Sequence, residues 1–267
     1  MHTTASDGLL SPSALVARAD AVGLTTISVT DHDTVAALAE VRQHTAAAGM
    51  TLVPGIEVTS VHEKRDVHLL GYFFDESDPE LARFLTAQRL HRVERLRQIA
   101  AMLARLGKVI DVEKLISEAA RTPGASVGRP MIGRALVQLG HVKSIQDAFD
   151  RYLGSGRPAF VPRVGPSPAD VIAAIHAAGG IASMAHPGLT NQPALVGPMA
   201  KAGLDAIEVY HNDHTSEMRD EALALAKRFS LLVSGGSDYH GDDERRPIGV
   251  IRLPPADFEA LVARANR

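Results

Sequence analysis

The strongest constraint on the fold is an alternation of short apolar strands with helices, interrupted once by a long helical stretch. Apolar and β-branched segments typical of buried strands lie at residues 25–30, 51–58, 67–74, 181–185, 206–210, 231–234 and 250–253. The pairs Ser11-Pro12 and Ser167-Pro168 each predict a helix start, with serine as N-cap and proline in the first turn. About seven strands, each followed by a helix or long loop, predict an α/β protein with a distorted (β/α)7 barrel. A doubly wound open sheet is the alternative.

The interruption contains no strand pattern. Four helical segments follow one another there, at residues 78–107, 112–120, 131–139 and 144–153. A run of helices inside a strand–helix alternation is typical of an inserted subdomain. We therefore expect three segments, namely the first part of the barrel at 1–77, a helical insert at 78–160 and the second part of the barrel at 161–267. We expect the arginines between residues 89 and 105 to face solvent.

Composition limits the kinds of site that the chain can build. It contains no cysteine, which excludes disulfides and zinc–thiolate sites. A metal would have to be held by histidine, aspartate and glutamate, which suit Mn, Fe, Zn or Mg. A net charge of −3 does not favour a long nucleic-acid groove, although a few arginines could hold a small anion. Neither a signal-peptide pattern nor a membrane-spanning apolar run occurs, so we expect a cytoplasmic location and no membrane partner.

Metal-binding residue types recur at one end of the predicted strands. They are His32, Glu57, His68, His186, Glu208, Asp238 and His240, with His2 and Asp7 ahead of the first helix. Barrel enzymes build their sites at the carboxyl ends of the strands, so this placement predicts one shared metal site. A single histidine beside a strand is more often structural, with roughly one chance in five of binding metal. His44 and His176 lie within helices, and we expect both to be structural or surface residues.

These residues stand in motifs that resemble those of the PHP (polymerase and histidinol phosphatase) superfamily. In chain order the motifs read HTTASDG at 2–8, TDHD at 30–33, GIEV at 55–58, HLLG at 68–71, AHP at 185–187 and GSDYH at 236–240. The chain is most similar to bacterial members with a helical insert before the Ala-His-Pro motif. Those include 3′,5′-nucleotide bisphosphate phosphatases and 5′→3′ exoribonucleases. The resemblance implies metal-dependent hydrolysis of phosphate monoesters or diesters in nucleotides or short oligonucleotides.

The resemblance also implies a centre of two or three divalent ions, Mn before Fe, Zn or Mg. The ligands would form three sets: Asp7, His32 and His240; Glu57, His68 and His186; and His2, Glu57 and Asp238 with one further histidine. The family pattern places that histidine, and a first strand, before His2. We expect a start assigned too late, because a barrel without its first strand would expose an edge. An incomplete third site is the alternative.

The remaining candidates concern a small phosphorylated substrate. By the resemblance, Arg129 and Arg157 contact its phosphate, because the guanidinium fork matches phosphate oxygens. Arg134 more plausibly lies on a solvated helix face. Asp31 and His214 are the catalytic candidates, with His214 ranked above His211 as the donor of a proton to the leaving oxygen. Two alternative functions stay open: a small-metabolite phosphatase, similar to histidinol phosphatase, and a catalytically weak metal-binding barrel.

Overall fold

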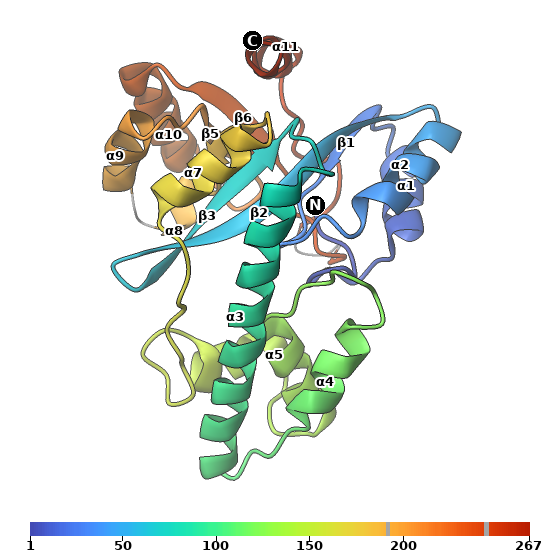
Figure 1. The fold of residues 1–267 in the computed structure, drawn as a ribbon, viewed down its shortest axis with the longest axis vertical. Helices are drawn as coiled ribbons and strands as arrows, with labels where there is room; N and C mark the ends of the chain where they lie inside the picture. The colour runs from blue at the N-terminus through green and yellow to red at the C-terminus, as the bar shows by residue number, and fades with distance from the viewer. Residues whose placement is uncertain (191–192, 243–245) are drawn as a thin grey trace.

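The computed structural model describes residues 1–190, 193–242 and 246–267, and within them a six-stranded sheet has its strands in chain order (Figure 1). The strands are β1 (Thr26–Val29), β2 (Thr51–His62), β3 (Arg65–Tyr72), β4 (Ile181–Met184), β5 (Ala206–His211) and β6 (Leu232–Gly236). β3 pairs antiparallel with both of its neighbours, and the other pairs are parallel. Five strands therefore end at the same edge of the sheet, which is the geometry needed for a shared site.

Two expectations about the strands were wrong. β2 and β3 form a hairpin whose turn residues, Glu63 and Lys64, both have positive φ, so no helix or long loop separates them. Residues 250–253 form no strand. They lead into Pro254 and Pro255, which have no N–H to donate to a ladder. The described residues thus contain six strands where about seven were expected.

The first residues of the chain lie between the two ends of the sheet. The backbone N–H of Thr30, just after β1, donates to the Met1 carbonyl at 2.8 Å. The N–H of His2 donates to the Tyr239 carbonyl, after β6, at 2.8 Å. This short segment links the carboxyl ends of β1 and β6 and fixes His2 beside the strand ends.

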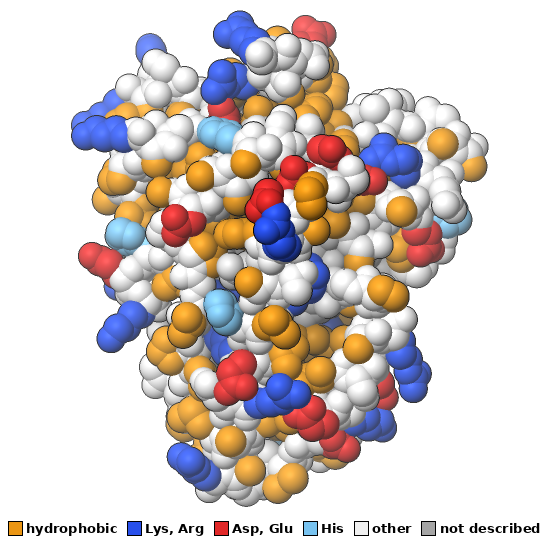
Figure 2. All heavy atoms as spheres, viewed as in Figure 1, with side chains coloured by type: hydrophobic (Ala, Val, Ile, Leu, Met, Phe, Trp, Pro, Cys, Tyr) orange, Lys and Arg blue, Asp and Glu red, His pale blue; other side chains and the backbone are white. Residues whose placement is uncertain are grey.

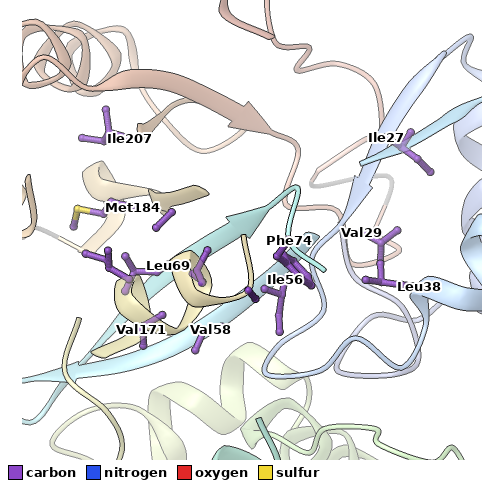
Figure 3. Close-up of a cluster of buried hydrophobic side chains, with 14 of the residues drawn as sticks. Ile27, Val29, Leu38, Ile56, Val58, Leu69, Phe74, Val171, Met184 and Ile207 are labelled. Atoms are coloured by element: carbon purple, nitrogen blue, oxygen red, sulfur yellow. The ribbon is translucent and has the colours of Figure 1, made fainter. Parts of the chain in front are cut away.

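Helices pack around the sheet and bury one main core. They are α1 (Pro12–Ala21), α2 (Leu38–Ala47), α7 (Pro168–Ala177), α8 (Pro187–Thr190), the 3-10 turn η2 (Pro193–Leu195), α9 (Val196–Lys201), α10 (Ser216–Phe229) and α11 (Pro255–Ala265). The predicted caps are confirmed, since Ser11 accepts from Ala14 N–H and Ser167 forms a capping box with Asp170. Figure 3 shows Val58 and Leu69 of the hairpin gathered with Val171 of α7 in this core. None of the helices in the described ranges has the length and apolar character needed to cross a membrane.

A second group of helices lies at the other end of the molecule (Figure 1), and we call it the helical group. It comprises α3 (Pro79–Arg105), α4 (Val112–Ala119), α5 (Arg129–Gln138), α6 (Ile145–Ala148) and the π-helical turn η1 (Phe149–Leu153). These helices bury a separate apolar cluster that includes Ile99 and Leu136. The long helix α3 contributes to both cores, because Leu81 and Leu85 near its start belong to the main one. α3 therefore ties the helical group to the sheet.

Candidate metal centre

The structure brings all eight predicted metal ligands into one cluster beside the carboxyl ends of β1, β4 and β6. They come from the N-terminal turn (His2, Asp7), from the residues after β1, β4 and β6 (His32, His186, Asp238, His240) and from within β2 and β3 (Glu57, His68). Three of their combinations have ligand atoms within 4.8 Å of one another: His2, Asp7, His32 and His240; His32, Glu57 and His68; and His2, Glu57 and Asp238. The sheet register thus converts residues far apart in sequence into compact donor sets.

Glu57 lies at the middle of this cluster and is almost fully buried. Its Oε1 is 2.6 Å from His68 Nδ1 and 3.3 Å from His186 Nε2, and its Oε2 is 3.2 Å from His2 Nε2. A carboxylate with imidazoles on both oxygens can bridge two cations. The bridging role that the family resemblance implies for Glu57 stays a prediction.

The donor atoms have the character of a metal site rather than of a closed hydrogen-bond network. The Nδ1 atoms of His2, His32, His68 and His186 are buried and accept or donate no hydrogen bond among the described residues. Buried polar atoms normally have partners, and unpaired ones are costly. His68 Nδ1 lies 2.6 Å from Glu57 Oε1 without the geometry of a hydrogen bond. A divalent cation between such atoms would satisfy both, and the nitrogen and oxygen donors fit one.

The pKa shifts of these side chains also favour a cation site. Burial lowers the pKa of His32 to about 3, so this imidazole is neutral and able to donate a lone pair. Burial alone would also lower the pKa of His2, but hydrogen bonds to Asp238 and Glu57 outweigh it and raise the pKa to about 10. Burial would raise the pKa of Glu57, yet His32 and His68 hold it well below its usual range. The carboxylates therefore favour positive charge at His2, and a divalent cation would supply the same kind of charge.

The backbone at the site is strained in a way that fixes the ligands. His186 and Asp238 have positive φ, 29° and 47°, which is unusual for residues with a Cβ. Glu208, within β5, accepts a hydrogen bond from the His186 N–H at 2.7 Å. Burial raises the pKa of this carboxyl. Glu208 thus positions the ligand His186 through its backbone. The sequence pattern had grouped Glu208 with the candidate ligands themselves.

The two residues predicted to be catalytic occupy different surroundings. Both oxygens of Asp31 are engaged, since they accept from Thr3 N–H, Thr3 Oγ1 and Ser6 Oγ at 2.5–2.7 Å. Asp31 is buried and holds the turn that carries Asp7, so the geometry favours a positioning role over the catalytic one predicted. His214 is also buried, and its Nδ1 is 2.9 Å from the Val209 carbonyl.

Two residues that were ranked low or missed lie nearer the centre. His211 Nε2 is buried without a hydrogen bond, 3.5 Å from Asp238 Oδ2. Its ring stands between those of His186 and His214, at centroid distances of 5.8 and 5.1 Å. Arg246 pairs with Asp238 and Asp213. Both residues contact Asp238, which was predicted as a ligand, but the sequence pattern did not show which side chains would surround it.

A small cavity of about 120 Å³ adjoins the metal ligands, and we call it the arginine pocket. One wall contains Asp7, His32 and His68, and the other wall and rim contain Thr59, Asp66, Arg92, Arg95, Leu96, Val127, Gly128, Arg129, Pro130, Phe149 and Arg163. The pocket therefore places four guanidinium groups next to the candidate cation site. Elsewhere, on the face seen in Figure 2, basic and acidic side chains are interspersed.

The expectation that the arginines of α3 face solvent was wrong for the two that line the pocket. Arg92 and Arg95 are only 5% and 6% exposed. Arg92 binds the fully buried Asp33 and donates to Thr59 Oγ1 and the Val127 carbonyl. Buried guanidinium groups need this compensation, and a carboxylate inside the fold supplies it. The sequence did contain a signal for this burial, because the polar residues Gln88 and Arg92 are spaced four apart in line with the apolar face of α3.

The three arginines considered as phosphate contacts lie in different places relative to the arginine pocket. Arg129 lines the pocket, as expected of a phosphate contact. Arg134 is half-buried, and its Nη1 donates to the Asp7 carbonyl at 3.3 Å, so it does not lie on a solvated face. Arg157 is exposed and is not among the lining residues. This last position is at odds with the phosphate contact predicted for it.

Comparison with known proteins agrees with this geometry. The PHP domain model matches residues 1–122. The chain is 36% identical to the 5′-3′ exoribonuclease Rnm of Escherichia coli (strain K12), covering 90% of this chain and 83% of that protein. It is 32% identical to a 3′,5′-nucleoside bisphosphate phosphatase of Chromobacterium violaceum, covering 95% and 91%. A crystal structure from Bifidobacterium adolescentis, described as a metal-dependent phosphoesterase, superposes with a TM-score of 0.89 at 30% identity, covering 98% and 94%.

Proposed function

The chain belongs to the PHP family, and from this premise we propose that it is a metal-dependent phosphoesterase acting on nucleotides or short oligonucleotides. The single observation that carries the proposal is the shared wall between the ligand cluster and the arginine pocket. Asp7, His32 and His68 face both. A group held by the arginines would therefore lie directly beside the candidate cation site.

We propose two or three divalent cations, Mn²⁺ first, held by the eight clustered side chains. The Asp7, His32 and His240 set, the Glu57, His68 and His186 set and the His2, Glu57 and Asp238 set would hold one each. Such ions supply Lewis-acid polarisation of a phosphoryl oxygen and lower the pKa of a water. Support comes from the unpaired buried imidazole nitrogens and from the central carboxylate of Glu57.

The substrate proposal rests on charge and size. The pocket of about 120 Å³ has room for a phosphate-sized group, and its guanidinium donors suit phosphate oxygens. Arg92, Arg95, Arg129 and Arg163 would orient a phosphate of the substrate while the reacting phosphate faces the ligand cluster. The helical group, proposed here as the insert of residues 78–160, supplies three of these four arginines.

We assign the leaving oxygen to the side of the site opposite the arginines. His211 and His214 do not line the arginine pocket, and either could donate a proton to that oxygen. Burial lowers the pKa of His214, so less of it carries a proton near pH 7, which disfavours it as the donor. His211 is the nearer to the ligand cluster because of its 3.5 Å approach to Asp238.

The test measures phosphate release from 3′-phosphoadenosine 5′-phosphate and from histidinol phosphate, and release of mononucleotides from a short 5′-phosphorylated oligoribonucleotide. Each substrate is assayed with Mn²⁺, with Zn²⁺ and after chelation. We expect turnover of one or both nucleotide substrates, dependent on metal, and little of histidinol phosphate. Preference for histidinol phosphate would replace the proposal with a small-metabolite phosphatase. Tight nucleotide binding without turnover under any metal would point to a non-catalytic barrel.

A further inference from the structure

Two carboxylates accompany the four guanidinium groups of the arginine pocket, and they are bonded in opposite ways. Asp33 is fully buried and makes close contacts. Its Oδ1 accepts from the Thr59 N–H at 2.9 Å, and its Oδ2 binds Arg92 Nε closely. Asp33 therefore acts as a fixed anchor behind the pocket.

Asp66 stands on the pocket wall and touches its neighbours only loosely. Its Oδ2 is 3.6 Å from Arg95 Nη1 and 3.5 Å from Arg129 Nη2, and its Oδ1 is 3.8 Å from Arg163 Nε. Charge-assisted hydrogen bonds are typically about 2.7–2.9 Å long. The carboxylate thus lies among three guanidinium groups with only one long hydrogen bond, from Arg129 Nη2.

The donors around Asp66 remain available to a ligand. Arg95 Nη2 and Arg163 Nε are buried and have no hydrogen-bond partner among the described residues. Both side chains are 7% exposed and line the pocket. Unpaired buried N–H groups are costly unless something binds them. The oxygens of a tetrahedral anion could reach these donors, whereas the carboxylate does not.

We propose that Asp66 sets the affinity of the arginine pocket for phosphate by acting as an internal anion. Its charge lowers the positive potential of the pocket while its position leaves the N–H donors free. A phosphate group then binds against the repulsion of Asp66, which keeps affinity moderate and lets the product leave. The inference deepens the proposed function and rests on it, because it assumes that the pocket receives a phosphate group.

Removing the charge should therefore tighten anion binding. A carboxylate a few ångströms from a phosphate dianion repels it even in a screened site. In Asp66→Asn we expect the dissociation constant of orthophosphate to fall by about tenfold or more. If Asp66 merely anchored the arginines, the same variant would bind phosphate more weakly, since the guanidinium groups would lose their position.

The experiment is isothermal titration of the chelated, metal-free full chain with inorganic phosphate, repeated with sulfate, whose charge is independent of pH. Asp66→Asn is compared with Asp66→Ser, which keeps the test valid if the first variant misfolds, and with Asp66→Glu, which retains the charge. Glu113→Gln is the matched control, because it removes an exposed carboxylate that pairs with Arg97 in the same helical group. We expect tightening in the two neutral variants only.

Unchanged or weaker binding in folded Asp66→Asn and Asp66→Ser would overturn the inference, as would a wild-type chain that binds neither anion. A parallel assay with Mn²⁺ and the nucleotide substrates separates this failure from failure of the proposed function. If the enzyme turns over substrate but the neutral variants do not bind phosphate more tightly, the role of Asp66 is rejected and the phosphoesterase proposal stands. Tightening without turnover retains the anion site and rejects the reaction.

Discussion

The two walls of the candidate site are built on different principles. The ligand cluster takes its residues from within β2 and β3 and from the turns beside the other strand ends, so the sheet register fixes their positions. The arginine pocket instead receives long side chains from α3, from α5 and from the segment before α7. Those side chains are held by carboxylates and carbonyl groups. Cation sites of this kind are thus placed by the backbone, whereas the anion pocket is placed by ion pairs.

The largest effect on activity should come from a substitution in the ligand cluster. Glu57→Gln keeps the shape of the side chain but removes the charge shared by two proposed ions. We expect metal content to fall and turnover to drop by at least about 10³-fold, equivalent to several kcal/mol. Elemental analysis and the phosphate-release assay check both. Full turnover with normal metal content would remove Glu57 from the centre.

In the arginine pocket, the largest effect of a substitution should be on the stability of the fold. Arg92→Met removes the close partner of fully buried Asp33 and leaves an under-compensated charge. Breaking a buried pair in this way costs about 3–5 kcal/mol of unfolding free energy, and Arg163, 3.4 Å away, should keep the loss near the lower figure. Urea unfolding measures it. A variant as stable as the wild type would mean that Arg163 alone compensates Asp33.

A smaller effect on binding should follow from Arg95→Ala. Arg95 is anchored by a 2.8 Å hydrogen bond from its Nε to the Val161 carbonyl, with Nη2 left for a ligand. Loss of a hydrogen bond to a charged group is worth about 1.5–3 kcal/mol, so phosphate affinity should weaken by about 10- to 100-fold. Metal content should not change. Loss of metal instead would show that the two walls are not separable.

Acid should weaken the ion-paired wall in a predictable pH range. Burial would raise the pKa of Asp33, but Arg92 and Arg163 outweigh it and lower the pKa below the ordinary 3.8. A depressed carboxyl pKa stabilises the fold above the unfolded value, and this contribution is lost as the pH falls through the folded value. The difference in Tm between the wild type and Asp33→Asn should therefore be constant above about pH 5 and narrow below about pH 4. A constant difference down to pH 3 would contradict the ion pairing.

The smallest effect is expected at Arg157. This side chain is exposed and is not among the residues that line the pocket. Surface substitutions usually change free energies by no more than about 0.5 kcal/mol, so Arg157→Ala should leave KM within about twofold. A large rise in KM would restore the role that the family resemblance gave to this residue.

The same contrast explains what could be predicted from the sequence. The clustering of His32, Glu57 and His186 could be foreseen, because strand ends in a mostly parallel sheet must meet; their binding of metal stays a prediction. Arg95 could not be placed, because the helical pattern gives a face but not the partner across it. The failed strand at 250–253 was apolar enough but ran into two prolines.

The length of α3 has a consequence for the order of the anion pocket. The helix runs over 27 residues, about 40 Å, and Arg92 is its central residue, thirteen positions from either end. Helices fray from their termini, and mid-helix residues open only in larger unfolding events. The guanidinium groups of Arg92 and Arg95 therefore project from the least mobile part of the longest helix. These guanidinium groups are preorganised because the two ends of α3 pack into separate apolar clusters, which hold the helix in place.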